Sequence, residues 1–113
     1  MFEAKEMAKA ILVEIVPVLG AIRERDAELW DQAYRAAKSM ALNTAEGGKR
    51  TGKDRSYHFS IAAGSADELK TALEIAEIFG HVTDGQIAAA LALIDRELAM
   101  LWRLRNPRAN PRI

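Results

Sequence analysis

Residues 61–80, IAAGSADELKTALEIAEIFG, decide the fold of this chain. Apolar side chains recur in them at intervals of three and four residues, the period of an α-helix with one buried face. Gly80 predicts the end of this helix, because glycine accepts the left-handed conformation that closes many helices. Upstream, Thr51 and Asp54 have the spacing of a capping box and predict a start near residues 51–56. The apolar positions are Ile61, Ala62, Ala66, Leu69, Leu73, Ile75, Ala76 and Phe79.

The same period continues on both sides of this segment. Downstream, Thr83 and Gln86 repeat the capping-box spacing and begin a fourth helix with a heptad of apolar residues. Upstream, we expect Asp26 to cap a second helix that runs to about Gly47, and Gly20 to end a first helix. The stripes are Ala4, Ala8, Ile11, Ile15, Val18 and Ile22 in the first helix, Leu29, Ala33, Ala36 and Met40 in the second, and Ile87, Leu91, Ile94, Leu98 and Leu101 in the fourth.

Four helices joined by short turns predict an all-α protein, an antiparallel up-down-up-down four-helix bundle over residues 1–105. Residues 106–113, NPRANPRI, contain two prolines and no periodicity, so we expect a flexible C-terminal tail. The helices also carry a second apolar stripe beside the first, which either widens the core or is buried between subunits. The residue pattern alone leaves both interpretations open.

Composition and spacing exclude several kinds of site. The 113 residues contain no cysteine, which removes disulfides, thiolate metal sites and thiol nucleophiles. Glu14 and Pro17 interrupt the apolar N-terminal segment, so we expect no membrane span. We also expect no signal peptide. The predicted location is the cytoplasm. Neither His58 nor His81 has a glutamate three residues before it, as a di-iron bundle requires. We expect no catalytic residue, no metal and no cofactor, and therefore no enzyme.

Two blocks, SMALNTAEGGKR at residues 39–50 and SIAAGSADELKTALEIAEIFGHV at residues 60–82, resemble the four-helix-bundle family of the 23S rRNA intervening-sequence proteins. The resemblance spans nearly the whole chain and implies a ring of five subunits. The family includes the accessory variability determinant proteins of diversity-generating retroelements, which are ring-forming, strongly basic partners of a reverse transcriptase and nucleic acid. Most other members have no assigned activity. The matching residues are Ser39, Asn43, Ala45, Glu46, Gly47 and Arg50, then Ile61, Ala62, Gly64, Ser65, Glu68, Leu69, Thr71, Leu73, Ile75, Ala76 and Gly80.

Three features depart from the pattern of that family. Thr44 stands where the family usually has an aliphatic residue, and His81 where it usually has an aromatic one. The formal net charge is zero, with 16 basic and 16 acidic side chains, whereas the retroelement proteins are basic. Zero net charge still permits a local basic patch, since phosphate binding depends on where the charges lie.

We expect structural roles for several residues of the two blocks. We expect Gly47 and Gly48 to end the second helix in a left-handed conformation, and Asn43 and Glu46 to hydrogen-bond or pair with Arg50 or the third helix. Ser39 and Ser65 belong to the same structural set. Gly64 is expected to permit close approach of a neighbouring helix, because a mid-helix glycine otherwise costs about 1 kcal/mol. For Glu68, a buried polar role and an exposed one stay open.

The aromatic residues also have two interpretations each. Tyr57 and Phe59 flank His58 in the basic segment SYHF, where they either stack on a base or anchor the core. Trp30 and Trp102 are either interface anchors or core residues.

Charge is segregated along the chain. Residues 61–95 carry one basic and six acidic side chains, whereas residues 96–113 carry five basic and one acidic. In the predicted bundle, the turn after the second helix, the end of the fourth helix and the N-terminus lie at one pole, which is then basic. This pole is either a solvated end or a nucleic-acid site. Its cations are Lys49, Arg50, Lys53, Arg55, Arg103 and Arg105, with Arg108 and Arg112 beyond them. The acidic residues Glu24, Asp26, Glu28, Glu74, Glu77 and Asp84 gather at the other pole.

We therefore expect a non-enzymatic, homo-oligomeric, pentameric four-helix-bundle protein that acts as an accessory or scaffold component. The alternative is a nucleic-acid-binding module that uses the basic pole, as a partner of a reverse transcriptase or another nucleic-acid enzyme. The predicted partners are other copies of this chain, RNA or DNA, and an unidentified protein; no membrane is expected.

Overall fold

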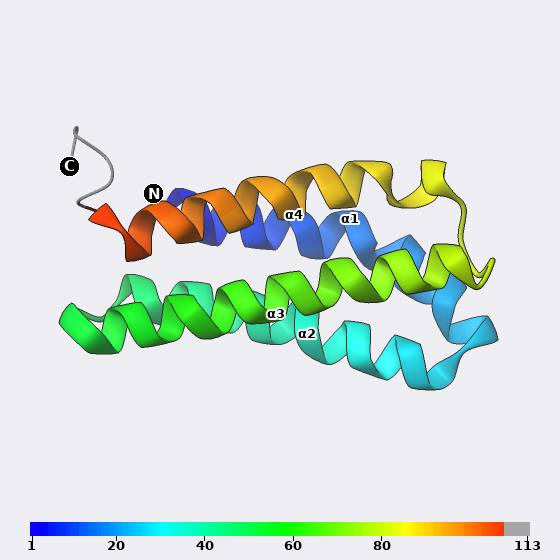
Figure 1. The fold of residues 1–113 in the computed structure, drawn as a ribbon, viewed down its shortest axis with the longest axis horizontal. Coiled ribbons are helices and arrows are strands. Elements are labelled where there is room, and N and C mark those ends of the chain that lie inside the picture. The colour runs from blue at the N-terminus through cyan, green and yellow to red at the C-terminus, as the bar shows by residue number, and fades with distance from the viewer. Residues whose placement is uncertain (108–113) are drawn as a thin grey trace.

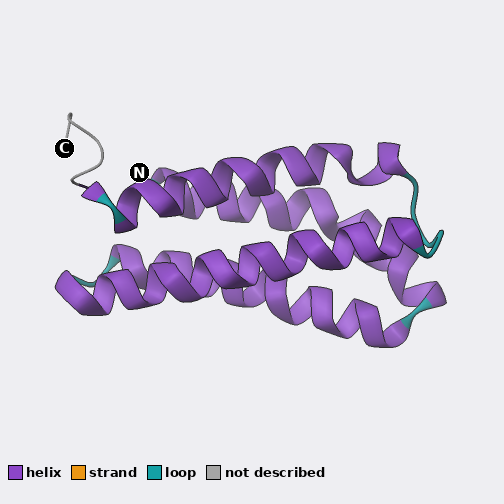
Figure 2. Ribbon diagram, viewed as in Figure 1, coloured by secondary structure: helices purple, strands orange, loops and turns teal. Residues whose placement is uncertain are grey.

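The computed structural model describes residues 1–107 and contains four helices, α1 (Glu3–Arg25), α2 (Ala27–Gly48), α3 (Gly52–Ile78) and α4 (Asp84–Arg105). Within this part of the chain there is no strand, and short loops join the helices (Figure 2). The predicted all-α class with four helices is confirmed. Residues 108–113, which hold most of the predicted tail and also Arg108 and Arg112, lie outside the described residues.

The helices lie side by side in a bundle about 44 Å long and 22 Å wide. Each helix packs against two neighbours, α1 and α3 both lying between α2 and α4. Figure 1 shows the α2–α3 turn, the start of α1 and the end of α4 at one end of the bundle, and the other two turns at the opposite end. We call the first of these the basic end and the second the turn end. The polypeptide thus reverses direction from each helix to the next.

The core consists of two clusters of buried side chains. The larger cluster runs along most of the bundle and includes residues from all four helices, among them Ile11, Met40, Leu69 and Ile94. The smaller cluster lies at the basic end and is formed by Phe59, Ala62, Ala63 and Leu101, with Phe2, Leu98 and Leu104 against it. Burial of these apolar side chains is the main force that holds the helices together.

Most helix ends follow the predicted signals. Asp26 caps α2, since the Leu29 backbone N–H donates to its Oδ1 at 3.0 Å. Thr83 and Gln86 form a reciprocal capping box at the start of α4, with bonds of 3.2 and 2.7 Å. Gly80 follows α3 with φ +76°, a conformation that favours glycine.

One predicted helix end is wrong, and one predicted capping bond is absent although its helix begins where expected. Helix α1 continues through Pro17 and Gly20 to Arg25, because its apolar stripe continues to Ile22, which is fully buried. Thr51 occupies the N-cap position of α3, but its side chain accepts no capping hydrogen bond.

The roles predicted for three glycines are also wrong. Helix α2 ends at Gly48, but neither Gly47 nor Gly48 adopts a left-handed conformation, and the C-cap residue Lys49 has φ −95°. A Cβ at Gly47 would lie 2.5 Å from Cε1 of Phe59, and one at Gly48 would lie 2.8 Å from Cε2 of Phe2. Close packing against the buried Phe59 ring therefore requires Gly47, whereas Gly48 faces the half-buried ring of Phe2. Gly64 does not permit a close helix approach, because it is exposed and a Cβ there would meet no atom within 4 Å.

Candidate functional site at the basic end

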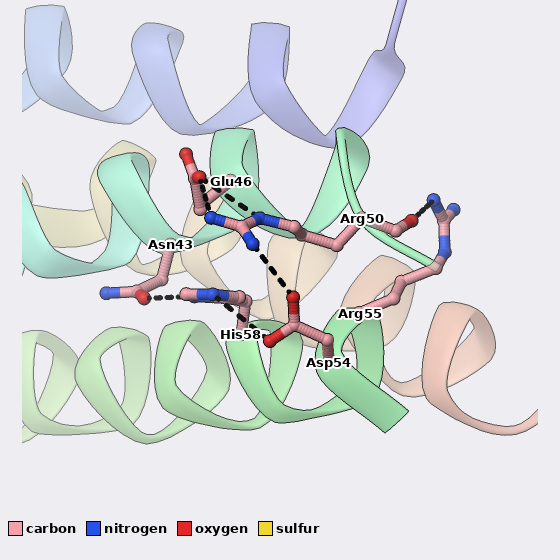
Figure 3. A network of polar contacts seen from close by, with 6 residues as sticks. All are labelled: Asn43, Glu46, Arg50, Asp54, Arg55 and His58. Carbon is pink, nitrogen blue, oxygen red and sulfur yellow. Dashed lines mark hydrogen bonds and ion pairs between the residues drawn. The ribbon is translucent and has the colours of Figure 1, made fainter. Parts of the chain in front are cut away.

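The two sequence blocks meet in a polar network between α2 and α3. Ser65 Oγ donates to Ser39 Oγ at 2.8 Å, and Asn43 Nδ2 donates to the carbonyl of Ser39 at 3.0 Å. The Asn43 Oδ1 lies 3.0 Å from His58 Nδ1 (Figure 3). Because an amide oxygen only accepts hydrogen bonds, His58 Nδ1 carries the proton of this bond. The side chains of this network therefore tie α2 to α3 beside their apolar contact.

Arg50 lies in the α2–α3 turn between two carboxylates (Figure 3). Its Nη2 donates to Glu46 Oε1 at 2.9 Å, and its Nη1 donates to Asp54 Oδ2 at 3.0 Å. The hydrogen bond from Arg50 is the largest cause that lowers the pKa of Glu46, and the same bond raises the pKa of Arg50. His58 Nε2 lies 3.8 Å from Asp54 Oδ1 and links this group to Asn43. The charge of Arg50 is thus balanced locally by Glu46 and Asp54.

The side chain of Arg55 binds backbone carbonyls at the carboxyl end of α2, where a left-handed glycine was expected. Its Nη1 donates to the carbonyls of Gly47 and Arg50 at 3.4 and 3.5 Å. Its guanidinium also lies over the ring of Phe59, 4.9 Å from the ring centre. A cation at the carboxyl end of a helix is favoured by the helix dipole and by the unpaired carbonyls there. Arg55 is therefore a structural cation as well as a surface one.

The remaining predicted cations are more accessible. Lys49, Lys53 and Arg103 are exposed, and among residues 1–107 none of them forms an ion pair. Arg105 is half-buried and its Nε donates to the carbonyl of Leu101 at 3.2 Å. A surface groove of about 370 Å³ lies between the start of α3 and the end of α4 at this end of the bundle. It is lined by Gly52, Arg55, Ser56, Arg103, Leu104 and Pro107.

The other residues named from the sequence are distributed as follows. Glu68 is exposed, so a buried polar role for it is wrong. Phe59 is fully buried and anchors the core, whereas Tyr57 is exposed. Trp30 is half-buried beneath the guanidinium of Arg23, 4.4 Å from its ring centre. Trp102 is 51% exposed near the basic end.

His81, which departs from the family pattern, ties the two connections of the turn end together. Its Nε2 lies 3.2 Å from Oδ2 of Asp26. The pKa of Asp26 is lowered, first by the hydrogen bond from the Leu29 backbone and then by His81. Asp26 therefore caps α2 and holds the α3–α4 connection with the same carboxylate.

Sequence reasoning missed Glu97, the one fully buried charged side chain of the described residues. Thr44 Oγ1 donates to its Oε2 at 3.4 Å, and its Oε1 has no hydrogen-bond partner within residues 1–107. Burial raises the pKa of Glu97 to about 7, with Thr44 opposing the shift. The apolar heptad of the fourth helix indicates that Glu97 is buried, because Glu97 follows Ile94 by three residues and precedes Leu101 by four.

Neither a metal site nor a membrane span is found in the part of the chain that is described. No group of three or more histidine, cysteine, aspartate or glutamate side chains is placed to hold an ion in residues 1–107. None of the four helices is long and apolar enough to cross a membrane.

Comparison with known proteins identifies the same family that the two sequence blocks resemble. Residues 2–103 match the family described as 23S rRNA-intervening sequence protein. A solved structure from Bacteroides thetaiotaomicron, a protein of unknown function from the S23 ribosomal protein family, is similar with a TM-score of 0.82. The two chains share 19% identity, and the similarity covers 91% of this chain and 98% of that one. No match was found among curated proteins. The family match extends over both blocks and all four helices, so the chain belongs to the 23S rRNA-intervening sequence protein family.

Proposed function

We propose that the chain is a non-enzymatic accessory or scaffold protein of the cytoplasm that assembles into a cyclic homo-oligomer, a pentamer. The observation that carries this proposal is the amount of large apolar surface that the single chain leaves exposed. On α1, Val13 and Val16 are 74% and 66% exposed, and Pro17 and Gly20 beside them carry no charge. The other exposed large apolar residues on the helices and their ends are Tyr34, Leu42, Tyr57, Ile78, Phe79 and Trp102.

The α1 face is the strongest candidate for the contact between copies. Val13, Pro17 and Gly20 recur at four and three residues, so they lie on one side of the helix, away from buried Ile11, Ile15 and Val18. Contiguous apolar surface of this kind is typical of an interface. A closed ring would bury the same face of every subunit, because each copy meets its neighbours in the same way.

The polar network supports the non-enzymatic part of the proposal. Catalysis by a hydroxyl nucleophile requires a base within hydrogen-bond reach of it. In the described residues, Ser39 and Ser65 bond to each other, and His58 bonds to Asn43 and not to either hydroxyl. The side chains that resemble catalytic types are thus engaged in joining α2 to α3.

The oligomer is tested by measuring molar mass in solution. We expect light scattering at micromolar concentration to give a discrete multiple of the chain mass, five in the proposed pentamer. The variant Val13→Asp/Val16→Asp should shift the mass to that of one chain, since it places two carboxylates in an apolar contact. Gln32→Asp, which adds a carboxylate at an exposed polar position of α2, is the matched control and should leave the mass unchanged. A single-chain mass for the unmodified protein would contradict the proposal.

A second candidate function is nucleic-acid binding at the basic end, as a partner of a reverse transcriptase or another nucleic-acid enzyme. The specific observation that favours it is the set of three exposed cations, Lys49, Lys53 and Arg103, which have no ion pair within residues 1–107. Glu46 and Asp54 offset Arg50, so these three carry the available positive charge. In a ring they would form a basic rim, because symmetry repeats them on one side.

This candidate predicts sequence-tolerant binding that weakens steeply with salt. The logarithm of the binding constant should fall linearly with the logarithm of salt concentration, because phosphate contacts release counterions. Lys49→Glu/Lys53→Glu/Arg103→Glu should abolish the binding and keep the oligomer, since Arg50 and Arg55 stay in place. Glu74→Gln/Glu77→Gln at the turn end is the control and should not weaken binding. Mobility-shift measurements at low salt that detect no complex with single- or double-stranded RNA or DNA would contradict the candidate.

A further inference from the structure

The carboxyl group of Glu97 lies at the junction of the two core clusters. Ile94, one turn before it on α4, belongs to the larger cluster, and Leu101, one turn after it, belongs to the smaller cluster with Phe59. The Glu97 side chain is fully buried, its Oε1 has no partner among the described residues, and its Oε2 has only the 3.4 Å contact with Thr44. A group with so few polar contacts is strongly destabilised if it becomes charged.

No countercharge reaches Glu97 from the helices that pack around it. Every charged side chain in this half of the bundle is exposed or half-buried, and none of them donates a hydrogen bond to Glu97. Several are paired elsewhere, as Lys70 is with Asp95 at 2.8 Å. These charged side chains include Glu6 and Lys9 on α1, Lys38 and Glu46 on α2, His58, Asp67 and Lys70 on α3, and Arg96 on α4 itself.

The part of the bundle beyond Glu97 has a small core of its own. Phe59 and Leu101 are its only large fully buried side chains in the described residues, and alanines complete it. Segments with few buried apolar contacts open at lower free energy than the rest of a fold. Water can therefore reach an ionised Glu97 if the end of α4 separates from α3, without loss of the larger cluster.

We propose that Glu97 is a proton-controlled latch for the basic end: the protonated side chain is buried against Thr44 of α2 and lets the end of α4 stay packed in the bundle, and the ionised side chain opens this end. Opening would move Arg103 and Leu104 away from Arg55 and so disassemble the groove that these residues line. The inference concerns the single bundle and does not depend on what the basic end contacts.

The direction of the pH dependence follows from the burial. Because the pKa of Glu97 is about 7 in the folded chain and 4.5 ordinarily, the closed form binds the proton more tightly than the open form. The closed state is therefore fully favoured below about pH 4.5 and loses stability as the pH rises to about 7, beyond which the loss is complete.

Amide hydrogen exchange of the full chain, followed residue by residue with NMR, tests this latch. From about pH 5 to about pH 8, protection factors near Leu98, Leu101 and Ala62 should fall by about 100-fold. Those near Leu73 and Ile87, toward the turn end, should remain higher at about pH 8 than those of the basic end, because the larger cluster stays closed. In Glu97→Gln, which has the same shape but cannot ionise, the pH dependence at the basic end should disappear. Equal protection factors at both ends of the unmodified chain at about pH 8 would overturn the latch, because they would show that ionisation unfolds the whole bundle.

A second measurement keeps the inference testable if Glu97→Gln does not fold. The side-chain carboxyl carbon of Glu97 in the unmodified protein should titrate near pH 7, well above the ordinary value of 4.5. A titration midpoint near the ordinary value of 4.5 would show that Glu97 is ionised in the closed bundle, and the latch would be wrong.

Discussion

Replacing Glu97 with leucine should raise the free energy of unfolding by about 3 kcal/mol at about pH 8, the largest stabilisation that we expect from a single substitution in this chain. A pKa of about 7 against an ordinary 4.5 means that the folded chain disfavours the ionised carboxyl by about that amount. Leucine removes this cost and continues the apolar heptad between Ile94 and Leu101. Urea denaturation at a series of pH values measures the effect.

The pH dependence separates the charge from the packing. The folded pKa of Glu97 is raised, so the unmodified chain loses stability from this residue as the pH rises from about 4.5 to about 7. The difference between Glu97→Leu and the unmodified chain should therefore shrink as the pH falls through that window. A difference that stays constant with pH would show that the gain comes from shape and hydrophobicity alone.

Thr44→Val is the matched test of the only polar contact that Glu97 has within residues 1–107. In the unmodified chain it should lower stability, because the carboxyl then loses its one hydrogen bond inside the core. In the Glu97→Leu background it should have no unfavourable effect, since the Thr44 hydroxyl has then lost its partner on α4. Equal effects in both backgrounds would show that the 3.4 Å contact contributes nothing.

Apolar spacing predicts helices well in this chain because most core positions obey one period. The stripes of α1, α3 and α4 contain the buried residues Ile15, Leu69 and Ile94, as expected. Glycine and proline were weaker guides. Gly20 and Pro17 lie on the exposed side of α1, where residues of low helix propensity are tolerated. The buried apolar stripe decides where the helix ends.

The site was predicted less completely, because its contacts depend on side-chain geometry across helices. The pair of Arg50 with Glu46 is local, because the two residues are four positions apart at the end of α2, and such pairs can be expected from sequence. The bond between Asn43 and His58 joins two helices, and no spacing within one helix indicates it. Arg55 was expected as a surface cation, yet it closes α2 by binding carbonyls of residues that precede it by eight and five positions.

Gly47→Ala should destabilise the chain by about 2 kcal/mol, although alanine favours a helix by about 1 kcal/mol relative to glycine. The added Cβ would lie 2.5 and 2.6 Å from two ring carbons of Phe59, closer than such atoms approach in proteins. Phe59 is fully buried against Leu101 and lies under Arg55, so its ring has no free space to enter. Either the ring or the last turn of α2 must shift, and both belong to the basic end.

A double-mutant cycle with Phe59→Leu assigns this cost to the ring. Phe59→Leu alone should lower stability through lost burial, but it also removes the carbons that the new Cβ meets. In that background Gly47→Ala should be neutral or stabilising, which gives a coupling free energy of about 2 kcal/mol. Gly48→Ala is the control, since its Cβ would meet Phe2, a half-buried ring near the chain start that can move aside at little cost. If Gly47→Ala is equally harmful with leucine at position 59, the glycine is needed by the backbone of α2, and the packing account of this motif residue is wrong.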